Sequence, residues 1–382
     1  MKTNRGIIYI VGILFALAMA LTSYINSSYL ESYFSEAGVG VIYMSVSIAT
    51  IIALLFADRI LTRFGNRRTS LYFSALLALS LFLLAAGGGK ALVLLAFALY
   101  FISVNFLIAT LDVFVEDFSL KNSIGRFRGF YLMLINGSWV VAQLISSSVI
   151  ERSSFQGIYL LSALFMLLDV AVFHFFLRNF RDPVYEKIPI VKTIAFFEKN
   201  KNILRIYLVN LILKFFFAWM IIYTPIYLNR HLGFEWSEIG LIFTIMLLPF
   251  LLLDYPLGVL SDRIGEKKML IAGFLIAGIF TLVIPLIAAP LLLLWAAILF
   301  CTRVGAAMVE VMSENYFFKS VPEEDVDETA FFRNTTPLSF ILAPLLATLL
   351  LLLLPTFQYL FFVLGAILLL GVLVSLRLDD VR

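Results

Sequence analysis

Long apolar segments, separated by short polar or glycine- and proline-rich breaks, follow one another along the whole chain. A helix needs about 20 consecutive apolar residues to cross a bilayer, and twelve segments approach that length. They span residues 7–30, 39–57, 69–86, 91–114, 129–149, 155–177, 205–228, 237–258, 268–288, 291–312, 331–353 and 356–376. Strands of a transmembrane β-barrel would instead alternate apolar and polar residues over short stretches. The pattern therefore predicts an all-α polytopic membrane protein with 12 transmembrane helices.

The composition excludes several other classes of protein. Of 382 residues, 62% are hydrophobic and 14% are charged, and the mean hydropathy is +1.02, whereas soluble domains are about 25% charged. The single cysteine, Cys301, excludes a disulfide scaffold, and a net charge of +3 gives no reason to expect a nucleic-acid partner. The apolar stretch behind the N-terminal MKTNRG is too long for a secretory signal, so we expect an uncleaved first span.

Lysines and arginines are distributed very unevenly between the two sets of predicted loops. With the N-terminus in the cytoplasm, 22 of them fall on the inner side, and only Lys90, Arg152 and Arg230 fall on the outer side. Cytoplasmic loops of membrane proteins carry such an excess. We therefore expect a multi-pass protein of the cell (inner) membrane with both termini in the cytoplasm.

The polar segments of the first half of the chain recur in the second half. TRFGNRR at 62–68 matches DRIGEKK at 262–268, 200 residues later, and LDVFVEDF at 111–118 matches VEVMSENY at 309–316, 198 residues later. A long polar stretch with many basic residues separates the halves. These features predict two pseudo-symmetric six-helix bundles, residues 1–178 and 205–382, joined by a cytoplasmic linker, 179–204. Parallel repeats of this kind place transporter substrate sites near the bilayer midplane.

Two polar loops, which we call the first motif loop (residues 62–68) and the second motif loop (residues 258–268), carry a recognisable pattern. The second resembles the major facilitator superfamily (MFS) signature G-x-x-x-D-R-x-G-x-K/R-K/R. The first departs from it at Thr62 and Asp58. The resemblance implies an MFS fold and secondary transport by alternating access. The matching residues are Gly258, Asp262, Arg263, Gly265, Lys267 and Lys268 in the second loop, and Arg63, Gly65, Arg67 and Arg68 in the first.

The second motif loop also has a physical interpretation. Gly258 would let one helix approach another closely, and Gly265 would allow a tight turn. Asp262 would lie where a helix N-terminus presents its positive dipole end, and Lys267 and Lys268 would remain at the anionic inner surface. The alternative is a hairpin loop whose only role is to set the topology.

Acidic side chains follow one stripe on two equivalent spans. Buried carboxylates are costly unless paired, so we expect the motif-loop cations as their partners. The resemblance implies a charge latch that holds the outward-facing state. In the alternative, Asp112 or Glu310 carries protons or substrate. The stripes consist of Asn105, Asp112 and Glu116 in the first half, and of Arg303, Glu310 and Glu314 in the second half.

Two cations lie deep inside predicted spans. Arg303 falls near the middle of span 291–312, and Lys214 lies in span 205–228, one turn after Asn210. In the resembled family these spans line the central cavity, which suggests an anionic substrate such as a carboxylate or organic phosphate. In the alternative, Arg303 pairs with Glu310 or Asp254. Further polar side chains expected at the substrate site are Asn105, Asn136 and Gln143.

Two buried acids are candidates for proton coupling. Asp254 lies in span 237–258 and Asp169 in span 155–177. The span of Asp169 is peripheral in the resembled family, so for this residue we favour packing against His174 or a backbone group over proton coupling.

We therefore expect a secondary active transporter for a small, anionic solute, embedded in lipid as a monomer without cofactor or metal. A proton or counter-ion would drive it. A proton-coupled exporter of amphipathic compounds is the alternative, although the predicted fifth span lacks the G-x-x-x-G-P motif of such antiporters. A non-transporting membrane sensor is a further alternative. An ATP-driven pump would need a P-loop, and an intramembrane enzyme would need a catalytic motif; the sequence contains neither.

Overall fold

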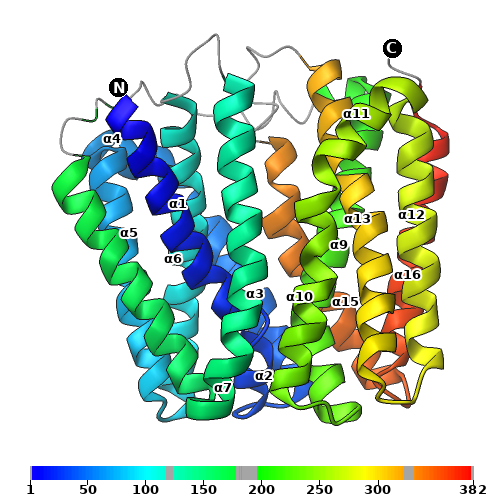
Figure 1. Cartoon of the computed structure of the whole chain (residues 1–382), viewed down its shortest axis with the longest axis horizontal. Coiled ribbons are helices and arrows are strands. Elements are labelled where there is room, and N and C mark those ends of the chain that lie inside the picture. Colours follow the sequence, from blue (N-terminus) through cyan, green and yellow to red (C-terminus); the bar gives the residue numbers. More distant parts are fainter. Residues whose placement is uncertain are drawn as a thin grey trace. The chain divides into compact units, whose positions relative to one another are not determined.

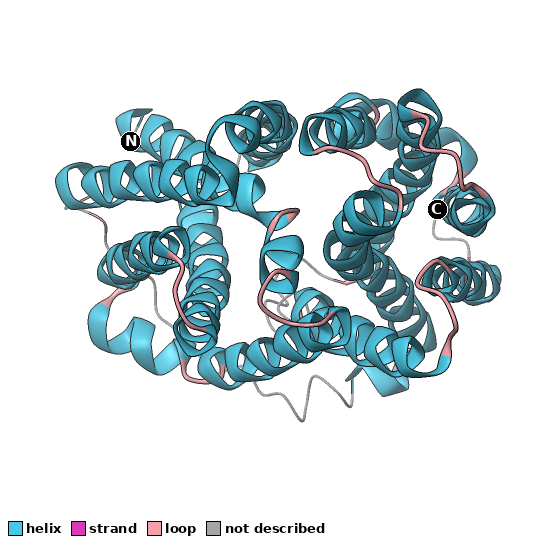
Figure 2. Cartoon of the chain, turned by 90° about the horizontal axis from the view of Figure 1, so that it is seen from below, coloured by secondary structure: helices cyan, strands magenta, loops and turns pink. Residues whose placement is uncertain are grey.

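The computed structural model describes residues 2–117, 124–177, 180, 182, 196–321 and 331–379. Within these ranges the chain forms helices, turns and loops and no strand (Figure 2). The predicted all-α membrane fold is thereby confirmed.

The chain divides into two compact units, which Figure 1 traces by colour along the sequence. Unit 1 comprises Met1–Ser35 and Ser45–Lys187, and unit 2 comprises Glu36–Met44 and Ile188–Arg382. The first nine residues of helix α3 thus belong to unit 2 and the rest of that helix to unit 1. The helices of the first half are α1 (Lys2–Ser23), α2 (Asn26–Glu31), α3 (Glu36–Leu54), α4 (Ala57–Phe64), α5 (Asn66–Ala86), α6 (Lys90–Asp117) and α7 (Ile124–Phe176).

Helix α7 contains two of the predicted spans. It runs over 53 residues, but Ser153 (φ −145°, ψ 15°) and Ser154 (φ 51°, ψ −162°) are not helical. In Figure 1 its ribbon turns back sharply beside the α7 label. Eleven helices in the described ranges are long and apolar enough to cross a membrane. Since α7 supplies two crossings, the count agrees with the predicted 12.

The first span is interrupted, whereas the sequence predicted one helix over 7–30. Helix α1 ends at Ser23, and α2 begins at Asn26 after a turn. Near this end the hydroxyl of Thr22 donates to the carbonyls of Ala18 and Met19, and that of Ser23 donates to Met19. Hydroxyls that bond to preceding carbonyls compete with the helical ladder and can bend a helix, and two of them lie at this end of α1.

The second half repeats the helix starts of the first. Helix α10 begins at Trp236, 200 residues after the start of α3, and α12 begins at Glu266, 200 residues after the start of α5. The helices are α9 (Lys201–Ile226), continued by the π-helical turn η1 (Tyr227–His231), α10 (Trp236–Leu252), α11 (Asp254–Ile264), α12 (Glu266–Val283) with the short 3-10 turn η2 (Ile284–Leu286), α13 (Leu292–Ser320), α15 (Thr335–Leu353) and α16 (Tyr359–Leu376).

The eighth predicted span is divided between α10 and α11. Pro249 in the last turns of α10 has no N–H for the helical ladder, and the helix ends at Leu252. Pro256 falls in the first turn of α11, where a proline N–H is not needed. Pro249 thus weakens the ladder just before α10 ends, Pro256 suits the start of the next helix, and Asp254 becomes the first residue of α11.

Glycines bring α12 and α13 into close contact in unit 2. A Cβ at Gly305 would lie 2.5 Å from the backbone nitrogen of Ala277 and 2.9 Å from its Cβ, and would also meet the carbonyl oxygen of Gly273. Small residues permit such approach of helix backbones in membrane proteins. This contact fixes α13, the helix that carries Arg303.

Candidate functional site

The charged centre of unit 2 is built around Arg303 on α13. This side chain is 1% exposed, and its guanidinium carbon lies 4.8 Å from the ring centre of Phe216 and 5.6 Å from that of Phe217, both on α9. A cation is attracted to the negative face of an aromatic ring, more strongly where water is excluded. Two aromatic rings therefore stabilise the buried arginine.

Lys214 and Glu310 join α9 to α13. The lysine Nζ lies 2.6 Å from Glu310 Oε1, and the side chains are 19% and 29% exposed. Lys214 also lies 5.3 Å from the ring centre of Phe217. The sequence suggested motif-loop cations or Arg303 as partners of Glu310, whereas the structure gives it Lys214. The pairing brings two of the predicted site residues together from spans almost 100 positions apart.

Two further acids lie near this pair. The charges of Glu310 and Glu314 both act on Lys214 and on Asp254, the first residue of α11. The centre thus brings three carboxylates and the cations Lys214 and Arg303 together in unit 2. Neighbouring carboxylates repel one another when all are ionised, so gain of a proton or of a bound cation would stabilise the group.

Asn210 connects this centre to α15. Its Nδ2 donates to the hydroxyl of Thr335 at 2.9 Å, and Asn210 is 3% exposed. Since it lies one turn before Lys214, this hydrogen bond helps to fix the rotation of α9.

The three predicted polar residues of the first half lie in unit 1. Asn105 on α6 donates to the carbonyl of Phe101 in its own helix, at 2.8 Å. Gln143 on α7 is 2% exposed and donates to the carbonyl of Ala20 on α1, at 3.0 Å. Asn136, on α7, is half-buried. Gln143 therefore joins two helices within the unit.

Asp169 has a different partner from the ones expected. It is 1% exposed, and its Oδ2 accepts a hydrogen bond of 2.7 Å from the hydroxyl of Ser74 on α5. The sequence suggested His174 or a backbone group instead. A serine hydroxyl on another helix, 95 residues away in the sequence, has no signal in the linear pattern.

The first motif loop is bonded to the end of α7. Gly65 has φ 78°, and the next residue, Asn66, donates its N–H to Asp182 Oδ1 at 2.5 Å. Arg67 donates to the carbonyls of Phe173 and His174, at 3.1 and 2.8 Å. A basic side chain suits a helix C-terminus, where carbonyls are unsatisfied. Arg67 thereby links the start of α5 to the end of α7. Of the expected acidic stripe, the side chain of Glu116 lies outside the described residues, while Asp112 is described and half-buried.

The second motif loop confirms one expectation and corrects another. Gly265 has φ 89°, the conformation that a tight turn between α11 and α12 requires. A Cβ at Gly258, however, would meet no described atom within 4 Å, so the close helix approach expected there is absent from the described structure. The side chain of Asp262 lies outside the described residues. Arg263 and Lys268 are exposed, and Lys267 is half-buried.

An ion pair that the sequence analysis missed joins this loop to α13. Glu266, the first residue of α12, is 3% exposed, and its Oε1 lies 2.5 Å from Lys319 Nζ. Glu266 occupies the position equivalent to Asn66, whose Nδ2 donates to the carbonyl of Thr110 on α6 at 2.9 Å. In both halves the residue after the motif glycine therefore holds its helix against a neighbour.

The sequence model of the Major Facilitator Superfamily matches residues 8–237 and 206–382. The chain belongs to the Major Facilitator Superfamily. Like other MFS proteins it is a multi-pass membrane transporter of small molecules. A search of curated protein sequences gave no match.

Solved transporter structures share this MFS fold. The chain aligns over 100% of its length with 98% of an auto-inhibited POT family peptide transporter (TM-score 0.79, 12% identity). It aligns over 99% with 98% of a bacterial homologue of the iron transporter ferroportin in an inward-facing state (TM-score 0.74, 16% identity). It aligns over 98% with 97% of the POT family transporter PepTSo (TM-score 0.79, 12% identity). At these identities the likeness concerns the fold alone.

This MFS chain also contains a polar contact that sequence reasoning missed, at the start of α3. Glu36 Oε1 lies 2.7 Å from His231 Nε2, whose ring stacks on Phe357 at 4.5 Å. Four residues along α3, a Cβ at Gly40 would lie 2.8 Å from the hydroxyl of Tyr223 and would also meet the hydroxyl of Thr348. The first turns of α3 therefore dock closely on α9, η1 and α15 within unit 2.

Proposed function

We propose that this MFS protein is a secondary active transporter for a small anion, with Arg303 and Lys214 as the anion-binding groups. The observation that carries the proposal is the position of Arg303, a 1% exposed arginine with two aromatic rings against its guanidinium. An arginine inside a membrane protein is costly and commonly marks a substrate or ion pathway. Its planar donor fork suits carboxylates and phosphates.

The remaining predicted groups have supporting roles in this proposal. Asn210 orients the lysine-bearing helix, while Asn105, Asn136 and Gln143 supply polar groups from the first half. Residues 1–178 and 205–382 form the two halves of an alternating-access cycle, with 179–204 as their linker. The excess of basic residues on one side supports cytoplasmic termini in the cell membrane. The transporter acts as a monomer.

The ion pair between Lys214 and Glu310 offers a coupling mechanism. An ammonium bonded at 2.6 Å by a carboxylate binds a second anion only weakly. Protonation of Glu310 removes the competing charge and leaves Lys214 available to the substrate. Proton and anion would then be bound together, and their joint release would restore the pair. Asp254 and Glu314 lie close enough to influence where the proton resides.

A proton-coupled exporter of amphipathic compounds is the second candidate. The observation that favours it is the group of three carboxylates, Asp254, Glu310 and Glu314, near Lys214. These carboxylates would attract a lipophilic cation stacked on Phe216 or Phe217. In this case Asp254 or Asp169 would carry the proton.

Flux measurements with the purified full-length chain in proteoliposomes distinguish these functions. Small carboxylates, organic phosphates and lipophilic cations would be tested with and without a pH gradient. We expect anion uptake, with an initial rate at least about tenfold lower in Arg303→Ala and partly retained in Arg303→Lys. Arg230→Ala removes an exposed arginine of the same unit and should transport at the wild-type rate. Anion uptake that Arg303→Ala leaves unchanged would refute the proposal, whereas uptake of cations alone would support the exporter.

The coupling mechanism has its own test in Glu310→Gln. Glutamine cannot release a proton, so substrate exchange across the membrane should persist while a pH gradient no longer drives accumulation. Accumulation that still follows the gradient would exclude Glu310 as the coupling group. The same assay on Asp254→Asn and Asp169→Asn then tests the other two carboxylates.

A further inference from the structure

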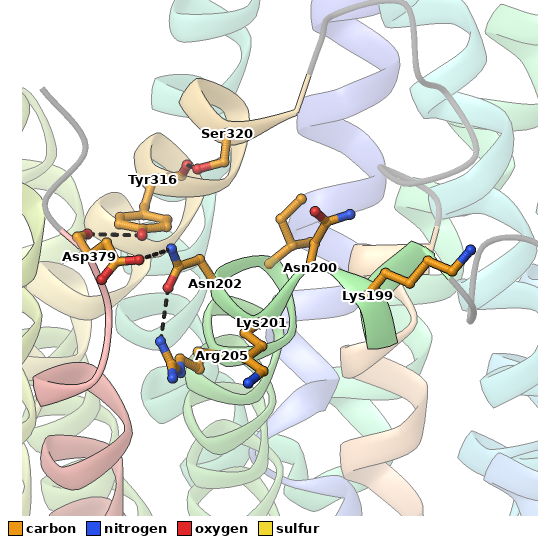
Figure 3. A pocket seen from close by; sticks show the side chains of 9 residues that line it. Lys199, Asn200, Lys201, Asn202, Arg205, Tyr316, Ser320 and Asp379 are labelled. Atoms are coloured by element: carbon orange, nitrogen blue, oxygen red, sulfur yellow. Dashed lines mark hydrogen bonds between the residues drawn. The ribbon is translucent and has the colours of Figure 1, made fainter.

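A cavity of about 650 Å³ lies at the start of α9. It is bounded by the residues around the first turn of that helix, the end of α13 and the segment after α16 (Figure 3). A volume of this size is typical of a small-molecule site. The lining residues are Lys199, Asn200, Lys201, Asn202, Ile203, Arg205, Tyr316, Ser320 and Asp379.

Asp379, the one acid among the described lining residues, is held by neutral groups. Asp379 Oδ2 accepts a hydrogen bond of 2.5 Å from Asn202 Nδ2, and its carbonyl accepts one of 2.9 Å from the Tyr316 hydroxyl. Figure 3 shows how these bonds continue from Asn202 to Arg205, whose Nη1 lies 3.0 Å from Asn202 Oδ1. These hydrogen bonds hold the segment after α16 against the first turn of α9, where it forms one wall of the cavity.

Three cations at this cavity have no carboxylate partner among the described residues. Within the described ranges no acid lies within ion-pair distance of Lys199, Lys201 or Arg205, and Arg205 donates to the neutral oxygens of Asn202 and Arg377. The lining residues thus combine three positive charges with one negative charge. A surplus of two positive charges in one cavity attracts an anion of one or two charges.

Backbone donors add to this attraction. Asn200 at the N-cap of α9 makes no side-chain bond to the first turn; its Nδ2 donates instead to the carbonyl of Phe196. The amides that begin a helix have no partner within it, and the residues of this turn, from Lys201 to Ile203, line the cavity. Oxygen atoms of an anion fit such donors.

We propose that this cavity binds a phosphate-bearing anion, either the phosphodiester of an acidic phospholipid or free phosphate. The cavity lies at the end of α9, where the apolar span Lys201–His231 begins, so it is at the depth of lipid headgroups. Basic clusters beside a transmembrane helix bind acidic headgroups in this way. The site is separate from the charged centre around Arg303 and does not depend on the transported solute.

The test compares two variants that each lose three positive charges. Lys199→Gln/Lys201→Gln/Arg205→Gln removes the cavity cations, and Lys90→Gln/Arg152→Gln/Arg230→Gln removes three exposed cations elsewhere. Full-length protein in phosphatidylcholine nanodiscs would be titrated with phosphatidylglycerol, and bound lipid would be counted by native mass spectrometry. We expect saturable binding of phosphatidylglycerol to the wild type and the control, and an affinity at least about tenfold lower in the cavity variant.

Inorganic phosphate distinguishes the two sources. Displacement of bound phosphatidylglycerol by millimolar phosphate would show a shared phosphate site. Phosphate binding that depends on the three cations, with no preference for phosphatidylglycerol, would assign the site to the free anion. Equal affinities of the cavity variant and the control for both ligands would overturn the proposal. If the triple variant does not fold, Lys201→Glu alone must weaken the binding of phosphatidylglycerol. Non-saturable binding of this lipid to the wild type would also refute the site.

Discussion

The contact between α12 and α13 allows a quantitative prediction for Gly305→Ala. The added Cβ would lie 2.5 Å from the nitrogen of Ala277 and close to the carbonyl oxygen of Gly273. Both are backbone atoms, so no rotation of a side chain relieves the overlap. Ordinary van der Waals contact begins at 3.4 Å, and the helices would therefore have to part by about 0.9 Å, the difference between these distances.

The expected loss of stability follows from two opposing effects. Overpacking of a filled interior costs about 1–3 kcal/mol, and a clash with backbone on two sides belongs at the upper end. Alanine recovers about 1 kcal/mol of helix propensity. The net loss is then about 2 kcal/mol, which corresponds to a fall in Tm of about 4–8 °C for a unit of this size.

A thermal melt of the purified protein in detergent measures this effect. Gly137→Ala is the matched control, because its Cβ would meet no described atom within 4 Å and it therefore reports the helix-propensity gain alone. The difference in Tm between the two variants isolates the cost of the overlap. A Gly305→Ala protein that melts within 1 °C of the control would refute the close packing of α12 on α13.

Three further predictions concern single contacts. Gly40→Ala should prevent the first turns of α3 from packing closely on α9 and α15. Transport by this variant should then be slower or abolished at normal expression, and a wild-type transport rate would contradict the prediction. Ser74→Ala should lower the free energy of unfolding by about 1–3 kcal/mol, because the buried Asp169 loses its donor, whereas Asp169→Asn should melt near the wild type. Lys319→Ala should lower Tm by a few degrees, because buried Glu266 loses its cation, whereas Lys319→Arg should preserve Tm. Equal Tm values for the two variants would exclude a stabilising ion pair.

The extent of the spans was predictable because lipid imposes a simple rule on sequence. Predicted span 91–114 lies within α6 (Lys90–Asp117), and predicted span 356–376 ends where α16 ends. Every backbone group in the bilayer needs an internal partner, so a long apolar segment has only the helix available to it. The break between α1 and α2 escaped prediction because hydropathy does not register a local change of backbone conformation within a span.

The candidate site was only partly predictable. The sequence identified Arg303, Lys214 and Glu310 as candidate site residues, because a charged side chain inside a membrane span is energetically costly. It did not identify which of them pair, because Lys214 and Glu310 meet only when α9 packs on α13. The pair between Glu266 and Lys319 was missed because both residues lie outside the predicted spans, where a charged side chain is not unusual.

The sequence by itself determined that the chain crosses the membrane in helices, that its halves repeat, and that charges lie within them. These properties depend on hydropathy and spacing, which are local and recur along one chain. Only the tertiary structure decided the partners: Lys214 for Glu310, Ser74 for Asp169, and aromatic rings for Arg303. A helix presents different residues to each neighbour, so the partner of a buried charge depends on the rotation and packing of two helices, and the apolar pattern of either helix does not encode it.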